Sequence, residues 1–234
     1  MKRFINQLVF LGFILVLLVG LYSCKVKKEE PSGSYVGYDY YPLTIGSYII
    51  YDVYDTSYAG STRIDTLYQL KELIFSSFQE GEDTKYVLYQ YFKKTTDVAW
   101  PDQPDSVWTL VNSSNQLIRT ENNISFIKLS FPVKEGLTWN GNARNVYDAH
   151  TYTMKKVDQV YNVLGFNYSQ TLMVEINKSE SIINKDFRYE IYARGIGPIK
   201  KDYTVYAYDQ ASLGTYTIDY GYRKVFLMTE HGQN

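Results

Sequence analysis

The chain has 234 residues, with 24 Lys and Arg against 25 Asp and Glu, so its formal net charge at pH 7 is −1. This balance gives no electrostatic reason to bind nucleic acid or an anionic membrane surface. A composition that is 45% hydrophobic and 17% aromatic excludes a disordered chain, and a single Cys excludes an internal disulfide or a cysteine-rich metal site.

The N-terminus has the pattern of a secretory signal. Lys2 and Arg3 precede an apolar run at 8–22, and the chain turns polar directly after Cys24. The run is shorter than the about 20 residues that a membrane-spanning helix needs. We therefore expect a cleaved signal over 1–23. An uncleaved anchor, or an ordinary signal beside a chance Cys, is the alternative.

The Leu-Tyr-Ser-Cys motif at 21–24 resembles the lipobox of bacterial lipoproteins, although Tyr22 is bulkier than that family usually has there. In the family the leader is cut before the Cys, which is then acylated. The resemblance implies a lipid anchor on Cys24, and each buried methylene adds about 0.8 kcal/mol of membrane affinity. Lys25, rather than Asp, follows the Cys, and in such lipoproteins this favours the outer membrane. The sequence leaves open whether the protein faces the periplasm or the cell surface.

Residues 24–37 are charged, contain Pro and Gly and lack apolar periodicity, which predicts a lipidated flexible tether ahead of one domain at 38–234. Four tyrosines gather where the tether meets the domain. Tyr offers broad amphipathic contact area with few rotors, so these side chains are the candidate contact surface for a ligand or partner. They are Tyr35, Tyr38, Tyr40 and Tyr41. Alternatively, the many Tyr residues of the chain shield the backbone of a sheet that has one solvent-exposed face.

A period of two residues dominates the domain and is clear at 85–94. Leu88 and Phe92 fall on one face of an extended chain there, and Val87 and Tyr89 fall on the other. Further segments of this kind predict strands near 47–54, 66–75, 106–111, 116–120, 124–131, 151–163, 168–177, 187–193, 199–208 and 216–228. We therefore predict an all-β fold, a single antiparallel β domain of roughly ten strands that forms a sandwich or a partly closed barrel.

Segment 65–78 also fits a helix. Leu67, Leu70, Ile74 and Phe78 follow one another at helical spacing behind a capping residue, Asp65. We predict a strand here and keep the helix as the alternative.

Two stretches, 41–48 and 131–139, share the pattern aromatic-Pro-apolar-x-x-Gly followed by an aromatic residue. Pro stops a strand and Gly permits a tight turn, so each copy is expected to be a corner where the chain re-enters the sheet. Chance recurrence of turn chemistry explains the pattern equally well. With the segment at 192–201, these corners resemble uncharacterised envelope lipoproteins of Bacteroidota type, a group without an established activity to carry over.

No motif for nucleophilic, phosphate-binding or zinc chemistry is present. Two histidines are too few for a metal site, so we expect no metal and no cofactor. Thr66 and Ser106 follow Asp and precede an apolar residue, which resembles the O-glycosylation signal of some envelope bacteria. Arg188 and Glu190 share a strand face and fit either an acid/base pair in a cleft or a surface ion pair.

The sequence thus predicts an outer-membrane lipoprotein that is not an enzyme and binds an envelope protein, a glycan or a lipid through its β domain. One alternative is a hydrolase of glycan or cell-wall material that uses a carboxylate pair. Another is a structural accessory subunit of an envelope complex. A pocket of several hundred cubic ångströms would favour binding, and paired carboxyl groups with shifted pKa values would favour the hydrolase.

Overall fold

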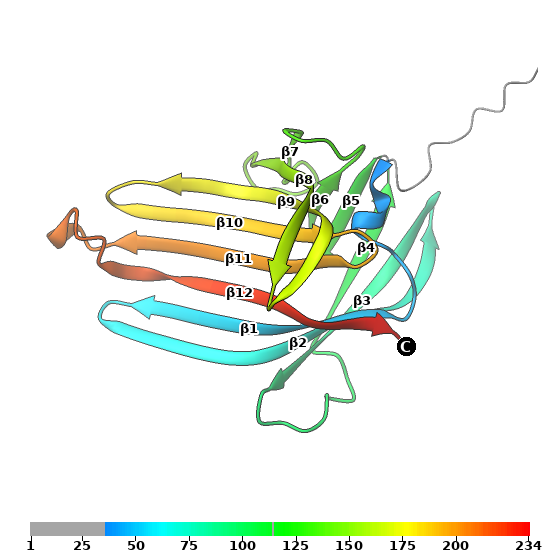
Figure 1. The fold of residues 1–234 in the computed structure, drawn as a ribbon, viewed down its shortest axis with the longest axis horizontal. Helices are drawn as coiled ribbons and strands as arrows, with labels where there is room; N and C mark the ends of the chain where they lie inside the picture. The colour runs from blue at the N-terminus through cyan, green and yellow to red at the C-terminus, as the bar shows by residue number, and fades with distance from the viewer. Residues whose placement is uncertain (1–35, 114) are drawn as a thin grey trace, which may run out of the picture. The chain divides into compact units, whose positions relative to one another are not determined.

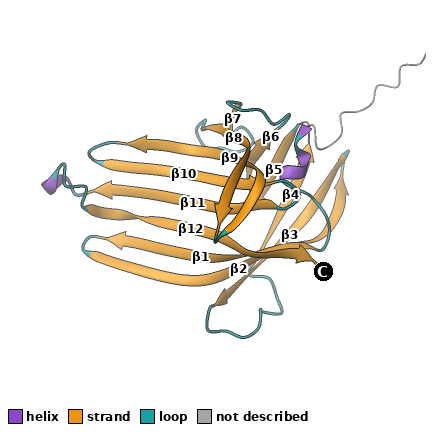
Figure 2. Cartoon of the chain, in the orientation of Figure 1, coloured by secondary structure: helices purple, strands orange, loops and turns teal. Residues whose placement is uncertain are grey.

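The computed structural model describes residues 36–113 and 115–234, so the signal, Cys24 and Tyr35 lie outside the described residues. The described part consists almost entirely of strands (Figure 2). The strands are β1 (Ser47–Ala59), β2 (Thr62–Glu80), β3 (Asp83–Lys94), β4 (Ser106–Ser113), β5 (Gln116–Glu121), β6 (Ile124–Ser130), β7 (Thr138–Asn140), β8 (Thr151–Val163), β9 (Phe166–Glu180), β10 (Asn184–Ala193), β11 (Gly197–Tyr208) and β12 (Ile218–Gln233). Two short 3₁₀ turns, η1 (Tyr38–Tyr40) and η2 (Gln210–Ser212), complete it. Within these ranges no helix has the length and apolar character to cross a bilayer.

The strands form one antiparallel sheet in the order β6-β5-β4-β3-β2-β1-β12-β11-β10-β9-β8-β7 (Figure 1). Consecutive strands pair with each other except β6 and β7, which form the two edges of the sheet. The last strand returns to pair with the first along the whole of β1. The predicted all-β antiparallel class is therefore confirmed.

The two edges of the sheet meet, so the domain is a partly closed barrel. The backbone N–H of Ile127 on β6 donates to the carbonyl of Gly141 just after β7, at 2.9 Å. The indole Nε1 of Trp139 on β7 donates to the carbonyl of Ile127, also at 2.9 Å. We call this contact between β6 and β7 the seam.

Segment 65–78 lies within the long strand β2, so the strand prediction is confirmed and the helix alternative is wrong. The sequence patterns did not predict strand β7. It has three residues, which is too short for a two-residue period to stand out in the sequence.

Both Pro-containing corners lead directly into a strand, the first into β1 and the second into β7. Gly46 and Gly136 take positive φ values of 87° and 76°, a conformation that favours glycine. The second corner also contacts the segment that precedes the first, because the N–H of Val133 donates to the carbonyl of Val36 at 2.9 Å. Much of the main apolar cluster of the domain is packed around these corners.

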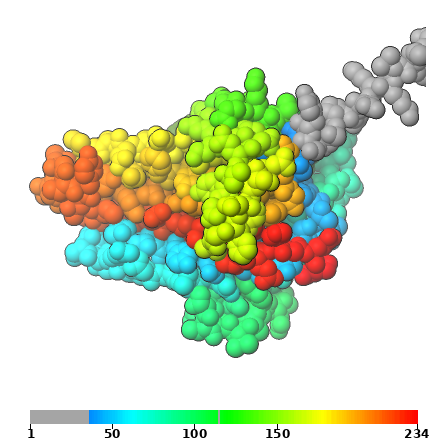
Figure 3. Space-filling model, viewed as in Figure 1, coloured from blue at the N-terminus to red at the C-terminus, as the bar shows by residue number. Residues whose placement is uncertain are grey.

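The β8–β9 hairpin folds across strands β10 and β11 (Figure 3). The bend lies in β8, where the ladder with β9 shifts register after Lys155 and where Lys156 and Asp158 have positive φ values. The hairpin tip places Val163 in an apolar cluster with Ile191, and Lys200 donates to the Tyr161 hydroxyl at 3.2 Å.

Candidate functional site

Charged side chains occupy positions on the inner face of the barrel. The side-chain alternation that buries Leu70 and Ile74 on β2 also buries Glu72, which is 3% exposed, between them. Neighbouring strands contribute further buried polar residues, namely Gln90, Arg119, Lys128, Glu190 and Lys201. Buried charges need partners, and these residues supply them to one another.

Glu72 is the first centre of this network. Its Oε1 accepts hydrogen bonds from Gln90 at 2.9 Å and from Lys201 at 3.1 Å. The guanidinium of Arg119 lies 3.6 Å from the same oxygen and also binds Glu121 at 2.6 Å. Burial opposes ionisation of Glu72, but Lys201 and Arg119 outweigh burial, so the pKa of Glu72 is lowered.

Glu190 is the second centre. Lys128 Nζ lies 2.6 Å from its Oε1, and the hydroxyls of Tyr192 and Tyr203 both donate to the same carboxylate. Burial opposes ionisation here too, but Lys128 and the neighbouring cations hold the pKa of Glu190 well below its usual range. Burial raises the pKa of Tyr203 well above its ordinary value, so this hydroxyl stays a donor.

A β-bulge turns Lys128 toward the network. Between Leu117 and Ile118 the ladder of β5 and β6 shifts register, so that Leu117 pairs with Leu129 while Ile118 pairs with Ile127. Lys128 is the extra residue on β6. The shift lets Lys128 and the adjacent Leu129 both be buried, although strict alternation would put one of them outside.

A cavity of about 390 Å³ lies against this network. Its wall combines basic, acidic and aromatic side chains from β2 to β6 and from β11 and β12. Its lining includes Tyr68, Glu72, Phe92, Ser106, Trp108, Arg119, Glu121, Lys128, Lys201, Tyr203, Lys224 and Phe226. We call this space the charged cavity.

Two polar atoms in the wall of the charged cavity lack hydrogen-bond partners among the described residues. They are the carboxylate oxygen Oε2 of Glu72, an acceptor, and the indole Nε1 of Trp108, a donor. Buried polar atoms are normally satisfied, so this acceptor and this donor are available to a water molecule or to a bound group.

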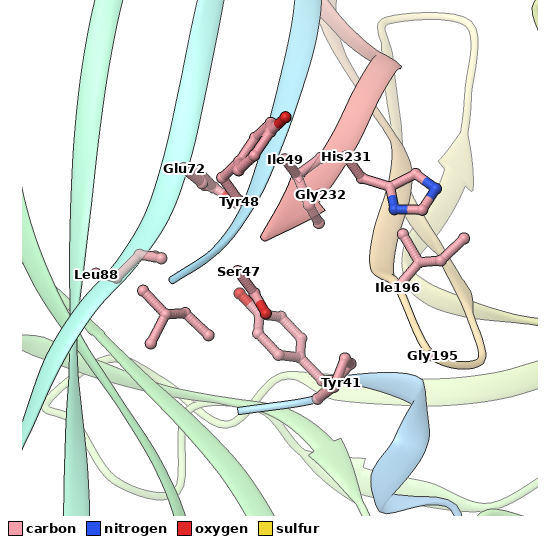
Figure 4. Close-up of a pocket in the computed structure, with 12 residues that line it drawn as sticks. Tyr41, Ser47, Tyr48, Ile49, Glu72, Leu88, Gly195, Ile196, His231 and Gly232 are labelled. Atoms are coloured by element: carbon pink, nitrogen blue, oxygen red, sulfur yellow. The ribbon is translucent and has the colours of Figure 1, made fainter. Parts of the chain in front are cut away.

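Glu72 also lines a smaller cavity of about 60 Å³ (Figure 4). Glu72 and Leu88 lie on one side of it, and Ile196 and His231 lie on the other. Its volume corresponds to about two water molecules, so it is too small for an organic ligand.

The predicted contact tyrosines belong largely to the core. Tyr40 is fully buried, and its hydroxyl donates to Asp158 at 2.8 Å. Tyr41 is also buried and lines the smaller cavity, and the ring of Tyr38 packs on that of Phe131 at 4.7 Å. Tyr38 and Tyr41 also line a further pocket of about 510 Å³, so a ligand contact by the predicted tyrosines stays a prediction.

Arg194 holds this tyrosine segment on the sheet. Its guanidinium binds Asp39 at 2.6 Å and Asp158 at 2.8 Å and lies 4.3 Å from the centre of the Tyr40 ring. The backbone N–H of Gly195 also donates to the Asp39 carbonyl at 2.7 Å.

The other predicted site residues are separate from one another. Thr66 is exposed on β2, whereas Ser106 at the start of β4 is half-buried and lines the charged cavity. Arg188 and Glu190 do not pair, since Arg188 binds Asp186 at 2.7 Å and Glu190 binds Lys128. Within the described ranges, no group of three or more His, Cys, Asp or Glu residues is placed to hold a metal ion.

No family model and no curated protein sequence matches this chain. One similar solved structure is a protein from Bacteroides fragilis described as exported and as having a YmcC-like fold. It matches with a TM-score of 0.45 and 11% identity, over 82% of this chain and 98% of that one. A protein described as a lipoprotein from Parabacteroides distasonis matches with a TM-score of 0.32 and 9% identity over the same shares. A DUF1329 family protein from Desulfovibrio piger matches with a TM-score of 0.21 and 14% identity, over 82% of this chain and 87% of that one.

Proposed function

We propose that this protein is a lipoprotein, anchored in the outer membrane through Cys24, whose β domain binds a small ligand in the charged cavity without converting it. The observation that carries this proposal is the charged cavity itself. Its volume of about 390 Å³ falls within the about 300–1,000 Å³ of typical small-molecule sites. Its wall also has aromatic surfaces and convergent polar groups, which such sites use to hold and orient a ligand.

The electrostatics of the wall favour binding over hydrolysis. A glycoside hydrolase needs one carboxyl group whose pKa is raised, so that it can donate a proton near neutral pH. The pKa values of Glu72 and Glu190 are instead lowered by neighbouring cations, and both side chains are ionised at neutral pH. They therefore suit hydrogen-bond acceptance rather than proton donation.

The lipid anchor is tested by labelling cells with radioactive palmitate. Wild-type protein should incorporate the label, and globomycin, which blocks cleavage of the lipoprotein signal, should leave the leader attached. Cys24→Ala should lose the label and move the domain into the soluble periplasmic fraction, because the acyl chains supply the membrane affinity. Ser23→Ala, which keeps a small residue before the Cys, is the matched control and should stay labelled. A labelled, membrane-bound Cys24→Ala variant would contradict the anchor.

Ligand binding is tested by native mass spectrometry of the full-length protein extracted from its own envelope. The wild-type protein should carry a small-molecule adduct. Ser106→Phe should lose it, because the ring would fill part of the charged cavity that Ser106 lines. Ser77→Phe makes the same change at an exposed position of β2 and should keep the adduct. An adduct that persists in Ser106→Phe, or no adduct on the wild-type protein, would overturn the proposal.

A further inference from the structure

We infer that the ligand of the charged cavity is a neutral sugar, of monosaccharide or disaccharide size. This inference rests on the proposed function and adds the chemical class of the ligand. Three features of the cavity wall support it. They are the carboxylate partners of its basic side chains, its two unpaired polar atoms and its aromatic surfaces.

The basic side chains of the wall are already paired, two of them with carboxylates outside the wall, Glu190 and Asp55. Each of the four basic side chains of the wall has a carboxylate partner within the described part of the chain. These pairs are Arg119 with Glu121, Lys128 with Glu190, Lys201 with Glu72, and Lys224 with Asp55 at 2.7 Å. An anionic ligand that bound Lys128 or Lys201 would have to displace a carboxylate from a buried pair and leave that carboxylate uncompensated, which is strongly unfavourable. A neutral ligand leaves all four pairs intact.

One of the two unpaired polar atoms is a hydrogen-bond acceptor and the other is a donor, so a ligand group that both donates and accepts hydrogen bonds suits them. Glu72 Oε2 needs a donor, and Trp108 Nε1 needs an acceptor. A hydroxyl offers one donor and two acceptor lone pairs, so a ligand with several hydroxyl groups satisfies both atoms. Lys128 and Lys201 have three N–H donors each, which provides further hydrogen bonds to hydroxyl oxygens without a change in charge.

The aromatic side chains supply flat apolar surfaces beside these polar groups. Tyr68 and Phe92 lie with their ring centres 5.8 Å apart, and both line the cavity. The guanidinium of Arg119 lies 5.0 Å from the centre of the Trp108 ring, which fixes the indole in the wall. A sugar ring has C–H faces for such surfaces and hydroxyl groups at its edge, whereas a fatty acid chain would leave the unpaired atoms unsatisfied.

The test is calorimetric titration of the full-length protein in a polyoxyethylene detergent, because a maltoside headgroup would compete. The neutral probes are glucose, galactose, N-acetylglucosamine and maltose. Glucuronate and galacturonate present the same rings with a carboxylate, and a short fatty acid tests the lipid alternative. We expect a neutral sugar to bind at least about tenfold more tightly than its uronate.

Trp108→Phe keeps an aromatic ring and removes the unpaired N–H donor, so it should weaken sugar binding by about tenfold. Trp100→Phe is the matched control, because Trp100 follows β3 in a loop and does not line the charged cavity. It should bind as wild type, and near-UV circular dichroism checks that both variants are folded.

Three results would overturn the inference. Uronates or the fatty acid could bind as well as the neutral sugars, the two Trp variants could bind alike, or no probe sugar could bind. If native mass spectrometry still finds an adduct in any of these cases, only the sugar class fails and the proposed ligand binding stands. Absence of any adduct instead removes the proposed function.

Discussion

Glu190 shows what one buried carboxylate requires in this fold. It is 1% exposed, and Lys128 and two tyrosine hydroxyls bind it directly. Removal of water from a charge costs several kcal/mol, which only close partners of opposite charge and good hydrogen bonds offset. Lys128 is the cation that pairs with Glu190 directly, so its removal should leave much of the buried charge uncompensated.

Replacement of Lys128 by Met keeps an unbranched side chain of nearly the same length but leaves Glu190 without the cation that pairs with it. We expect Lys128→Met to lower the free energy of unfolding by about 3 kcal/mol or more, the cost of breaking a buried ion pair from one side. Urea denaturation of the full-length protein, followed by near-UV circular dichroism, measures the change.

Lys85→Met is the matched control, because Lys85 pairs with Glu80 near the exposed β2–β3 turn, where the Glu80 side chain is 62% exposed. Exposed pairs contribute about 0–1 kcal/mol, so this variant should unfold close to wild type. If both Lys→Met variants lost the same free energy of unfolding, burial of the Lys128–Glu190 pair would not explain the loss in Lys128→Met.

Strand β2 shows why the two-residue period of a strand predicts this fold better than the spacing of a helix does. The helical reading put Leu67, Leu70, Ile74 and Phe78 on one face, yet Leu67 and Phe78 are exposed while Leu70 and Ile74 are buried. In the strand, Leu70, Glu72 and Ile74 share the inner face and are buried together, as a two-residue period requires. Most strands, and therefore the fold class, were predictable because the same period recurs along the domain.

The candidate site was far less predictable. A charged residue at a core position of an apolar strand, as with Glu72, is a signal that the sequence does contain. Its partner Lys201 is 129 residues away, and Lys128 is 62 residues from Glu190, so these pairs depend on sheet pairing that a single sequence does not specify. Lys128 also depends on the β6 bulge, which breaks the alternation by which inner positions are predicted.

Two sets of contacts close the barrel, the long ladder between β1 and β12 and the few hydrogen bonds at the seam. Strands β1 and β12 pair from Ser47 to Ala59, so β1 has a hydrogen-bonded neighbour on both sides. At the seam, the described contacts near the centre of β6 are the backbone bond from Ile127 to Gly141 and the Trp139 indole bond. Local opening follows the weakest contacts, so the barrel should open first between β6 and β7.

Trp139→Phe tests this order of opening. The variant keeps a ring beside Tyr152 but loses the donor to the Ile127 carbonyl, a hydrogen bond that contributes about 1 kcal/mol. Hydrogen–deuterium exchange at the Ile127 amide should then speed up by about fivefold, while amides of β1 should exchange as in wild type. Trp100→Phe, the same change away from the seam, should alter neither. If β1 and Ile127 speed up equally, their amides exchange through one global unfolding event, and the seam is no weaker than the β1–β12 ladder.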